Sequence, residues 1–224
     1  MSRLRIVFDL DDTLYAEREF AYSGFRAIGR WAHARWGLDG LAEDMTRLLD
    51  DGHLGALFKM AFDKHRPDHT ADEFAEMREI YRTHQPEITL YEDARWALDH
   101  FAGQGPIGLI TDGTTEMQQA KVGALEISSL FEKIIYTHEG GGREYHKPHP
   151  WSYEQMEAAI GEPGDRFVYV GDNASKDFLT PNARGWLSVQ VRRPRSIHDQ
   201  DKVAVGGDPQ HVIASLHGLE QILA

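Results

Sequence analysis

The chain has 224 residues, of which 41% are hydrophobic and 27% are charged, as in ordinary globular proteins. Its 36 acidic and 24 basic residues give a formal net charge of −12, which disfavours nucleic acid and anionic membrane surfaces as partners. The sequence contains no cysteine, which excludes disulfides, thiolate catalysis and cysteine-based zinc sites. Without a signal-peptide core or an apolar run of membrane-spanning length, we expect a cytoplasmic protein.

The first predicted elements are a buried strand and a long helical segment. Residues 4–10 (LRIVFDL) form an apolar run typical of a strand inside a parallel sheet. From residue 16 to residue 86 the apolar positions recur at helical spacing, as in Phe25, Ile28 and Trp36. This stretch lacks a convincing strand. We therefore expect residues 16–86 to form an all-helical domain inserted after the first strand.

Strands and helices then alternate to the end of the chain. The predicted helices cover residues 93–101, 116–124 and 152–160, with a short terminal helix to Leu223. The predicted strands cover residues 106–111, 133–137, 167–171, 187–191 and 211–216. This alternation predicts an α/β fold, a parallel sheet with helices on both faces, built from residues 1–15 and 87–224. Ligands of such sheets bind beyond the carboxyl ends of the strands.

Two aspartates follow the first predicted strand. Asp9 and Asp11 are two residues apart, so strand alternation would place both side chains on one side. One carboxylate could accept a phosphoryl group as an aspartyl-phosphate, while the other exchanges protons with the leaving alcohol and the attacking water. The alternative is a structural turn in which Asp12 or Thr13 caps the next helix.

Polar groups also follow the next strands. The Thr111 hydroxyl, with the backbone amides of Asp112 and Gly113, could bind a phosphoryl oxygen at the start of the following helix. Lys147, held between His146 and Pro148, could supply positive charge to the phosphate. The alternatives are a helix cap at residues 111–114 and a solvated loop lysine.

A further acidic group ends the strand at residues 167–171. Asp172 offers a hard oxygen ligand that suits Mg²⁺, and we expect it to bind the ion together with Asp9. Asp177, with Asn173 nearby in sequence, would orient Lys147 or a metal-bound water from outside the coordination shell. The alternative is an aspartate placed to stabilise a helix start.

The four segments DLDDT, ITDG, KPHP and GDNASKD resemble, in order, the motifs of the haloacid dehalogenase superfamily of phosphohydrolases. The resemblance implies a Rossmann-like core and a Mg²⁺ cofactor. It also implies the following roles: Asp9 as nucleophile, Asp11 as general acid and base with a main-chain carbonyl on the metal, Thr111 and Lys147 as phosphate ligands, and Asp172 and Asp177 as the acids of the metal site.

By the same resemblance, the helical insertion is a cap of the first type that closes over the core and selects the substrate. We therefore expect a magnesium-dependent phosphatase acting on a small phosphate monoester. Phosphotransferase or phosphomutase activity, 2-haloacid dehalogenation and a non-catalytic binding role remain as alternatives. The sequence does not indicate the substrate or the oligomeric state.

Overall fold

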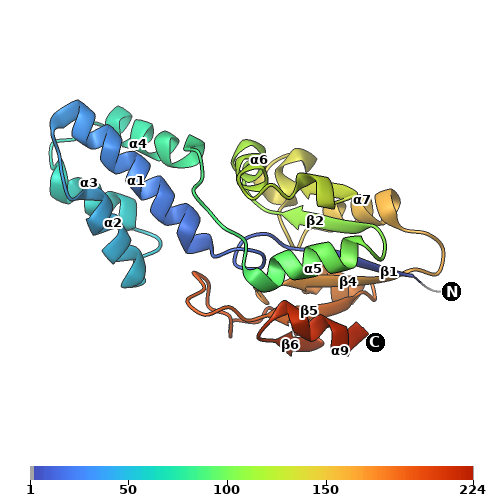
Figure 1. The fold of residues 1–224 in the computed structure, drawn as a ribbon. Coiled ribbons are helices and arrows are strands. Elements are labelled where there is room, and N and C mark those ends of the chain that lie inside the picture. Colours follow the sequence, from blue (N-terminus) through green and yellow to red (C-terminus); the bar gives the residue numbers. More distant parts are fainter. Residues whose placement is uncertain (1–2, 224) are drawn as a thin grey trace. The chain divides into compact units, whose positions relative to one another are not determined.

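The computed structural model describes residues 3–223, and the chain divides into two compact units (Figure 1). The first unit contains the chain up to Glu17 and again from Thr89 onward. The second unit is the intervening segment Arg18–Ile88. Among the helices of residues 3–223, none combines the length and the apolar character of a membrane span.

The first unit is built on one parallel sheet. Its described strands stand in the order β3-β2-β1-β4-β5-β6, the order of doubly wound nucleotide-binding sheets. Each neighbouring pair is parallel. The bounds are β1 Leu4–Phe8, β2 Ile107–Thr111, β3 Lys133–Tyr136, β4 Arg166–Gly171, β5 Leu187–Val191 and β6 His211–Ile213. The predicted α/β fold with a Rossmann-like sheet is therefore confirmed.

Both faces of the sheet are covered, because nearly every residue of the inner strands is buried. On one face, Val7, Ile110 and Tyr169 pack with Tyr153 and Met156 of α7. The α-helices of this unit are α5 Glu92–Ala102, α6 Thr115–Ala124, α7 Trp151–Ile160, α8 Leu179–Ala183 and α9 Leu219–Leu223. The 3-10 turns are η1 Ser128–Leu130, η2 Thr137–Gly140, η3 Arg143–Tyr145 and η4 Leu216–Gly218.

The strand order reverses between β1 and β4, and this reversal positions the site. In the β1–β4 register Phe8 lies opposite Val170, and the Asp9 N–H donates to the Val170 carbonyl at 2.8 Å. Asp9 and Asp172 therefore leave two adjacent strands at the same edge of the sheet. Ligands of open α/β sheets bind at such a switch point.

The second unit is helical throughout. It contains α2 Leu41–Asp50, α3 Leu57–His65, α4 Ala71–Thr83 and all of α1 Glu17–Trp36 except its first residue. Phe25 of α1 and Phe58 of α3 both contact the Tyr81 ring of α4, with centroids 5.9 and 4.8 Å from it. Thr70 begins α4 with a capping box, in which its hydroxyl and the Glu73 carboxylate each bond the other's backbone N–H. The unit thus has its own apolar core.

Candidate active site

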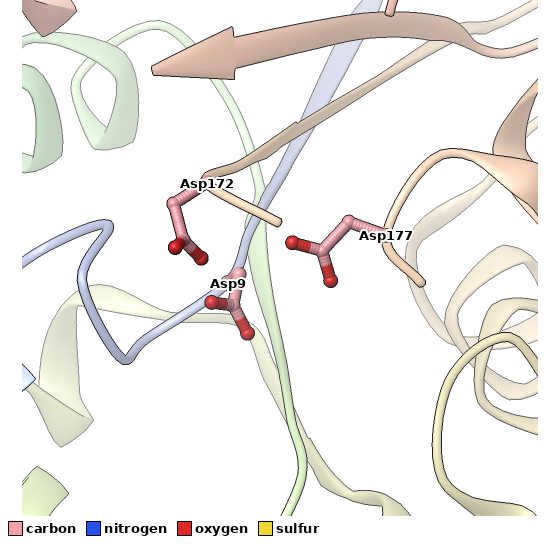
Figure 2. Close-up of side chains that lie close together, drawn as sticks. All are labelled: Asp9, Asp172 and Asp177. Atoms are coloured by element: carbon pink, nitrogen blue, oxygen red, sulfur yellow. The ribbon is translucent and has the colours of Figure 1, made fainter. Parts of the chain in front are cut away.

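Three carboxylates meet beyond the ends of β1 and β4 (Figure 2). Asp9 follows β1, Asp172 follows β4, and Asp177 lies on the loop before α8. One ligand oxygen of each lies within 4.8 Å of the others, and all three residues are buried. Three buried carboxylates this close repel one another unless cations lie between or beside them.

Lys147 is the first of these cations. Its ammonium group lies 2.5 Å from Asp9 Oδ1 and 2.8 Å from Asp177 Oδ1, and it donates to the Tyr169 hydroxyl at 2.9 Å. The Lys147 side chain is fully buried, which alone would lower its pKa, but Asp177 and Asp9 raise that pKa well above its ordinary value. The lysine is therefore charged and bridges the two carboxylates.

One lysine does not balance the cluster. Burial, opposed by Lys147 and assisted by Asp177, raises the pKa of Asp9 to about 6. Burial, with Asp177 and Asp9 nearby, raises the pKa of Asp172 well above its ordinary value. Two hard oxygen ligands that are difficult to ionise together fit a divalent cation such as Mg²⁺, which would stabilise both in the charged form. Asp9 and Asp172 are the residues that would hold it.

Asp177 differs from these two because one of its oxygens accepts from a backbone N–H, whereas the second oxygen of Asp9 has only a 3.3 Å hydrogen bond from the Thr13 hydroxyl. Oδ1 pairs with Lys147, while Oδ2 accepts from the Asn173 backbone N–H at 2.9 Å. The Asn173 side-chain oxygen in turn accepts from the backbone N–H and the hydroxyl of Ser175, at 3.1 and 2.5 Å. This arrangement suits the orienting role expected of Asp177 and Asn173 better than direct coordination.

The segment after β2 lies beside the same site. Thr111 is fully buried, and its hydroxyl oxygen accepts from Gln118 Nε2 at 2.5 Å. Gly113 has φ +134°, and a Cβ there would come within 3.0 Å of the Gln118 side chain. This glycine therefore allows a turn that a larger residue would strain. Because the Thr111 oxygen accepts from Gln118, the Thr111 hydroxyl hydrogen stays available for a phosphoryl oxygen.

The Asp112 side chain links three of the motifs instead of facing a phosphate. It accepts from the Thr137 hydroxyl at 2.9 Å, the Lys147 backbone N–H at 3.0 Å and the Lys176 ammonium at 2.8 Å. Burial raises the pKa of Asp112, but Lys147 and Lys176 outweigh this and hold it well below its usual range. An anionic Asp112 can contribute to phosphate binding through its backbone amide only.

Asp11 lies in a separate network. Strand β1 ends at Phe8, so the strand alternation used to place Asp11 beside the nucleophile does not extend to it. Its Oδ1 accepts from the Lys121 ammonium at 2.7 Å and from the Tyr15 hydroxyl, and its Oδ2 accepts from Gln118 at 2.9 Å. Burial raises the pKa of Asp11, but Lys121 and these hydrogen bonds lower it overall. Asp11 is therefore ionised in this state.

Three further residues belong to this site and were not predicted from the sequence: Gln118, Lys121 and Lys176. Gln118 and Lys121 are three apart on α6, a spacing that puts both on one helix face beside the ITDG segment. Lys176 lies inside the GDNASKD segment and reaches across to Asp112. The signal in the sequence was a polar and a basic residue, Gln118 and Lys121, on the inner face of a helix. A buried lysine requires a charged partner, so this pair predicts a nearby carboxylate.

A Rossmann-like sheet that carries buried carboxylates and a lysine at its switch point has the architecture of an α/β enzyme. Residues 5–181 match the model of the haloacid dehalogenase-like hydrolase family, and residues 144–219 match a second, HAD-hydrolase-like model. The chain belongs to the haloacid dehalogenase-like hydrolases. This confirms the resemblance seen in the four motifs.

Curated relatives match most of the chain. A glyceraldehyde 3-phosphate phosphatase of Methanocaldococcus jannaschii is 28% identical over 201 residues, covering 83% of each chain. A second protein of that name, from Methanopyrus kandleri, is 26% identical and covers 84% of this chain and 83% of its own. A pyrimidine 5′-nucleotidase of Escherichia coli is 26% identical and covers 97% of this chain and 96% of its own.

Solved structures share the fold over the whole chain. The HAD-hydrolase YfnB of Bacillus subtilis, solved bound to magnesium, has a TM-score of 0.68 at 17% identity, with 100% of this chain and 99% of that chain covered. An L-2-haloacid dehalogenase of Xanthobacter autotrophicus has a TM-score of 0.63 at 18% identity, with coverages of 100% and 98%. Structures described as phosphatases and as dehalogenases are both similar, so the fold does not separate the two chemistries.

Proposed function

We propose that this protein is a magnesium-dependent phosphatase that hydrolyses a small phosphate monoester through an aspartyl-phosphate on Asp9. Its class, phosphoric monoester hydrolase, rests on the family match and on phosphatase and nucleotidase relatives over most of the chain. The observation that carries the proposal is the meeting of Asp9, Asp172 and Lys147 at one end of the sheet. This combination provides a nucleophile, a cation ligand and a phosphate counter-charge.

In the first step an Asp9 carboxylate oxygen attacks phosphorus in line, and the bond between phosphorus and the ester oxygen breaks. Asp9, Asp172 and, as the family resemblance implies, the Asp11 carbonyl would hold Mg²⁺, and its charge would reduce the repulsion between the phosphate and the nucleophile. Lys147 and the Thr111 hydroxyl hold phosphoryl oxygens as negative charge develops on them. Asp177 keeps the Lys147 ammonium in place.

Asp11 handles the protons of both steps. Because Asp11 is ionised at rest, the proton that it gives to the departing alkoxide has to arrive with the phosphate monoanion or from solvent. In the second step Asp11 takes a proton from water as the water oxygen attacks phosphorus, and the Asp9–phosphoryl bond breaks. Inorganic phosphate leaves and the Asp9 carboxylate is restored.

The presence of both Asp11 and Asp172 favours a phosphatase over a dehalogenase. A halide leaves without a proton and its substrate carries no phosphate dianion, so dehalogenation needs neither an acid–base carboxyl nor a divalent cation. Both groups are present here, buried or nearly so. We further propose that the helical unit, residues 18–88, acts as the cap that selects the substrate, as the resemblance implies.

The proposal is tested by measuring phosphate release from a panel of esters with and without Mg²⁺. The panel includes glyceraldehyde 3-phosphate and pyrimidine nucleoside monophosphates, after the names of the relatives, together with p-nitrophenyl phosphate. We expect Mg²⁺-dependent release, and we expect Asp9→Asn to lower turnover by more than about 10³-fold while the circular dichroism spectrum is retained. Turnover by Asp9→Asn near that of the wild type would remove Asp9 from its role.

Parallel reactions distinguish the alternatives. Added alcohol acceptors would capture the phosphoryl group if the protein were a transferase, so new ester would form in place of inorganic phosphate. Halide release from 2-haloacids without Mg²⁺ would instead indicate dehalogenation.

A further inference from the structure

Gln118 joins two parts of the site that the four motifs leave separate. It lies on α6 and is completely buried. Its side-chain NH₂ group donates to Asp11 Oδ2 at 2.9 Å and to Thr111 Oγ1 at 2.5 Å. One amide therefore contacts both the proposed acid–base carboxyl and the proposed phosphate-binding hydroxyl.

The direction of these hydrogen bonds matters for the chemistry. The nitrogen of the Gln118 amide faces Asp11 Oδ2 and donates to it, so Asp11 accepts at this oxygen. Thr111 Oγ1 also accepts from this nitrogen, so its own hydrogen points elsewhere and can be donated to a phosphoryl oxygen. Lys121 holds the other oxygen of Asp11 at 2.7 Å. The Asp11 carboxylate is thus fixed at both oxygens from α6.

Stability alone does not account for a glutamine at this position. Among the described residues, none donates a hydrogen bond to the buried Gln118 Oε1. An unpaired buried carbonyl oxygen carries a desolvation cost that an apolar side chain of the same length would avoid. The same side chain also packs against Gly113, where even a Cβ would approach within 3.0 Å.

We propose that Gln118 is a positioning residue, which aligns the Asp11 carboxyl with the leaving oxygen and directs the Thr111 hydroxyl to the phosphate. The inference rests on the proposed phosphatase function. Its consequence depends on the leaving group, because an alkyl alkoxide needs a proton in the transition state whereas p-nitrophenolate hardly does. Loss of Asp11 alignment therefore slows the hydrolysis of alkyl esters more than the hydrolysis of p-nitrophenyl phosphate.

The experiment compares kcat/KM of Gln118→Met and wild type on p-nitrophenyl phosphate and on the best alkyl ester of the panel, with saturating Mg²⁺. We expect kcat/KM on the alkyl ester to fall by about 10- to 100-fold, the range typical of residues that orient a ligand from outside the coordination shell. The fall in kcat/KM on p-nitrophenyl phosphate should be smaller by a factor of at least about ten. The part of the loss that both esters share reports the Thr111 hydrogen bond, and the excess loss on the alkyl ester reports the alignment of Asp11. Gln119→Met is the matched control, since Gln119 is exposed on the same helix.

A double-mutant cycle with Asp11→Asn separates positioning from a general structural defect. Gln118→Met should no longer change the ratio of the two kcat/KM values once Asp11 is an amide, because the group that it aligns is gone. If Gln118→Met fails to fold, Gln118→Asn replaces it, since the shorter amide reaches both partners less well. Two results would overturn the inference. One is that Gln118→Met lowers kcat/KM equally on both esters in the wild-type background. The other is that it changes the ratio of the two kcat/KM values as much in Asp11→Asn as in the wild type.

The outcomes for Gln118 and for the proposed function are distinguishable. If the wild type hydrolyses no ester of the panel, or if Asp11→Asn treats both esters like the wild type, the proposed mechanism is wrong. If Asp11→Asn is selectively slow on alkyl esters but Gln118→Met is not, the mechanism stands and the assignment of Gln118 is wrong.

Discussion

Asp9 is surrounded by unlike charges, and their balance sets how it behaves. Lys147 at 2.5 Å favours its ionised form, whereas burial and the neighbouring Asp177 favour its protonated form. Burial is the largest of these influences, and the pKa of Asp9 is raised to about 6. In the mechanism that we propose, Asp9 has to be ionised to attack, so this balance would couple activity to pH and to the metal.

The raised pKa of Asp9 predicts that Mg²⁺ binding depends on pH. A protonated carboxyl is a poor metal ligand, so binding has to displace its proton when the pH is below about 6. We expect the Mg²⁺ dissociation constant to rise as the pH falls, by at least about tenfold per unit below pH 6, because Asp172, whose pKa is also raised, has to lose its proton as well. Titration calorimetry in buffers of different ionisation enthalpy measures both the affinity and the proton released.

The matched variant for this measurement is Asp9→Asn, which keeps an oxygen ligand but has no proton to lose. Its binding should be weaker at neutral pH and should lose the part of the pH dependence centred near 6. A dissociation constant for wild type that stays unchanged between pH 7 and pH 5 would contradict a role for Asp9 in holding the ion.

At the scale of elements, the end of β4 is packed tightly against the loop that follows it. A Cβ on Gly171 would lie 2.6 Å from Asp177 Oδ2. Asp177 cannot move aside freely, because Lys147 and the Asn173 backbone hold its two oxygens. Gly171, the last residue of β4, thus lets the Asp177 carboxylate approach closely enough to hold Lys147.

Gly171→Ala should therefore affect the site and the fold together. We expect a loss of about 1–3 kcal/mol in the free energy of unfolding, from overpacking. We also expect turnover to fall by about tenfold or more, because displaced Asp177 no longer orients Lys147. Denaturant unfolding and steady-state kinetics measure the two effects.

Gly123 offers the same substitution without the clash, since no atom beyond its chain neighbours and its own helix backbone lies within 4 Å of the Cβ it would gain. Gly123→Ala, near the end of α6, should be neutral or stabilising by up to about 1 kcal/mol, with turnover unchanged. If the two alanine variants behaved alike, Gly171 would not be the element that positions Asp177.

The helices and strands were predictable from the sequence where an apolar run or a helical periodicity marks them. The strand predicted at 187–191 has those bounds, and the one predicted at 133–137 ends a residue earlier, at Tyr136. The short helix α8, Leu179–Ala183, was not predicted, because five residues containing Pro181 carry no helical periodicity. Strand ends were located to within two residues, except in the last strand, which was predicted to reach Leu216 and ends at Ile213.

The candidate site was less predictable than the strands. The motifs placed Asp9, Asp172 and Lys147 at strand ends, and the structure brings these three together. Tertiary contacts decided the rest: the Asp11 carboxylate turns to Gln118 and Lys121 because α6 offers it donors. Spacing along one strand carries no information about a helix more than one hundred residues further along the chain.

For the whole molecule, the net charge of −12 and the catalytic task are in conflict, since an acidic protein has to attract a phosphate ester. Positive charge is supplied locally at the site. Three lysines pair with carboxylates around it, Lys147, Lys121 and Lys176, and a divalent cation would add further positive charge. The cation is therefore expected to be essential for binding substrate as well as for chemistry. The helical unit Arg18–Ile88 is a compact body of its own, as a substrate-selecting cap would be.

The central claim is that a phosphoryl group passes through Asp9, and trapping the intermediate tests it most directly. Asp11→Asn is mixed with p-nitrophenyl phosphate and Mg²⁺, quenched in acid and digested for mass spectrometry. Nitrophenolate leaves with little acid help, whereas water activation needs Asp11, so the intermediate should accumulate. We predict that the peptide containing Asp9 gains the mass of one phosphoryl group. A phosphoryl group on another residue, or nitrophenol release with Asp9 never modified, would contradict the account.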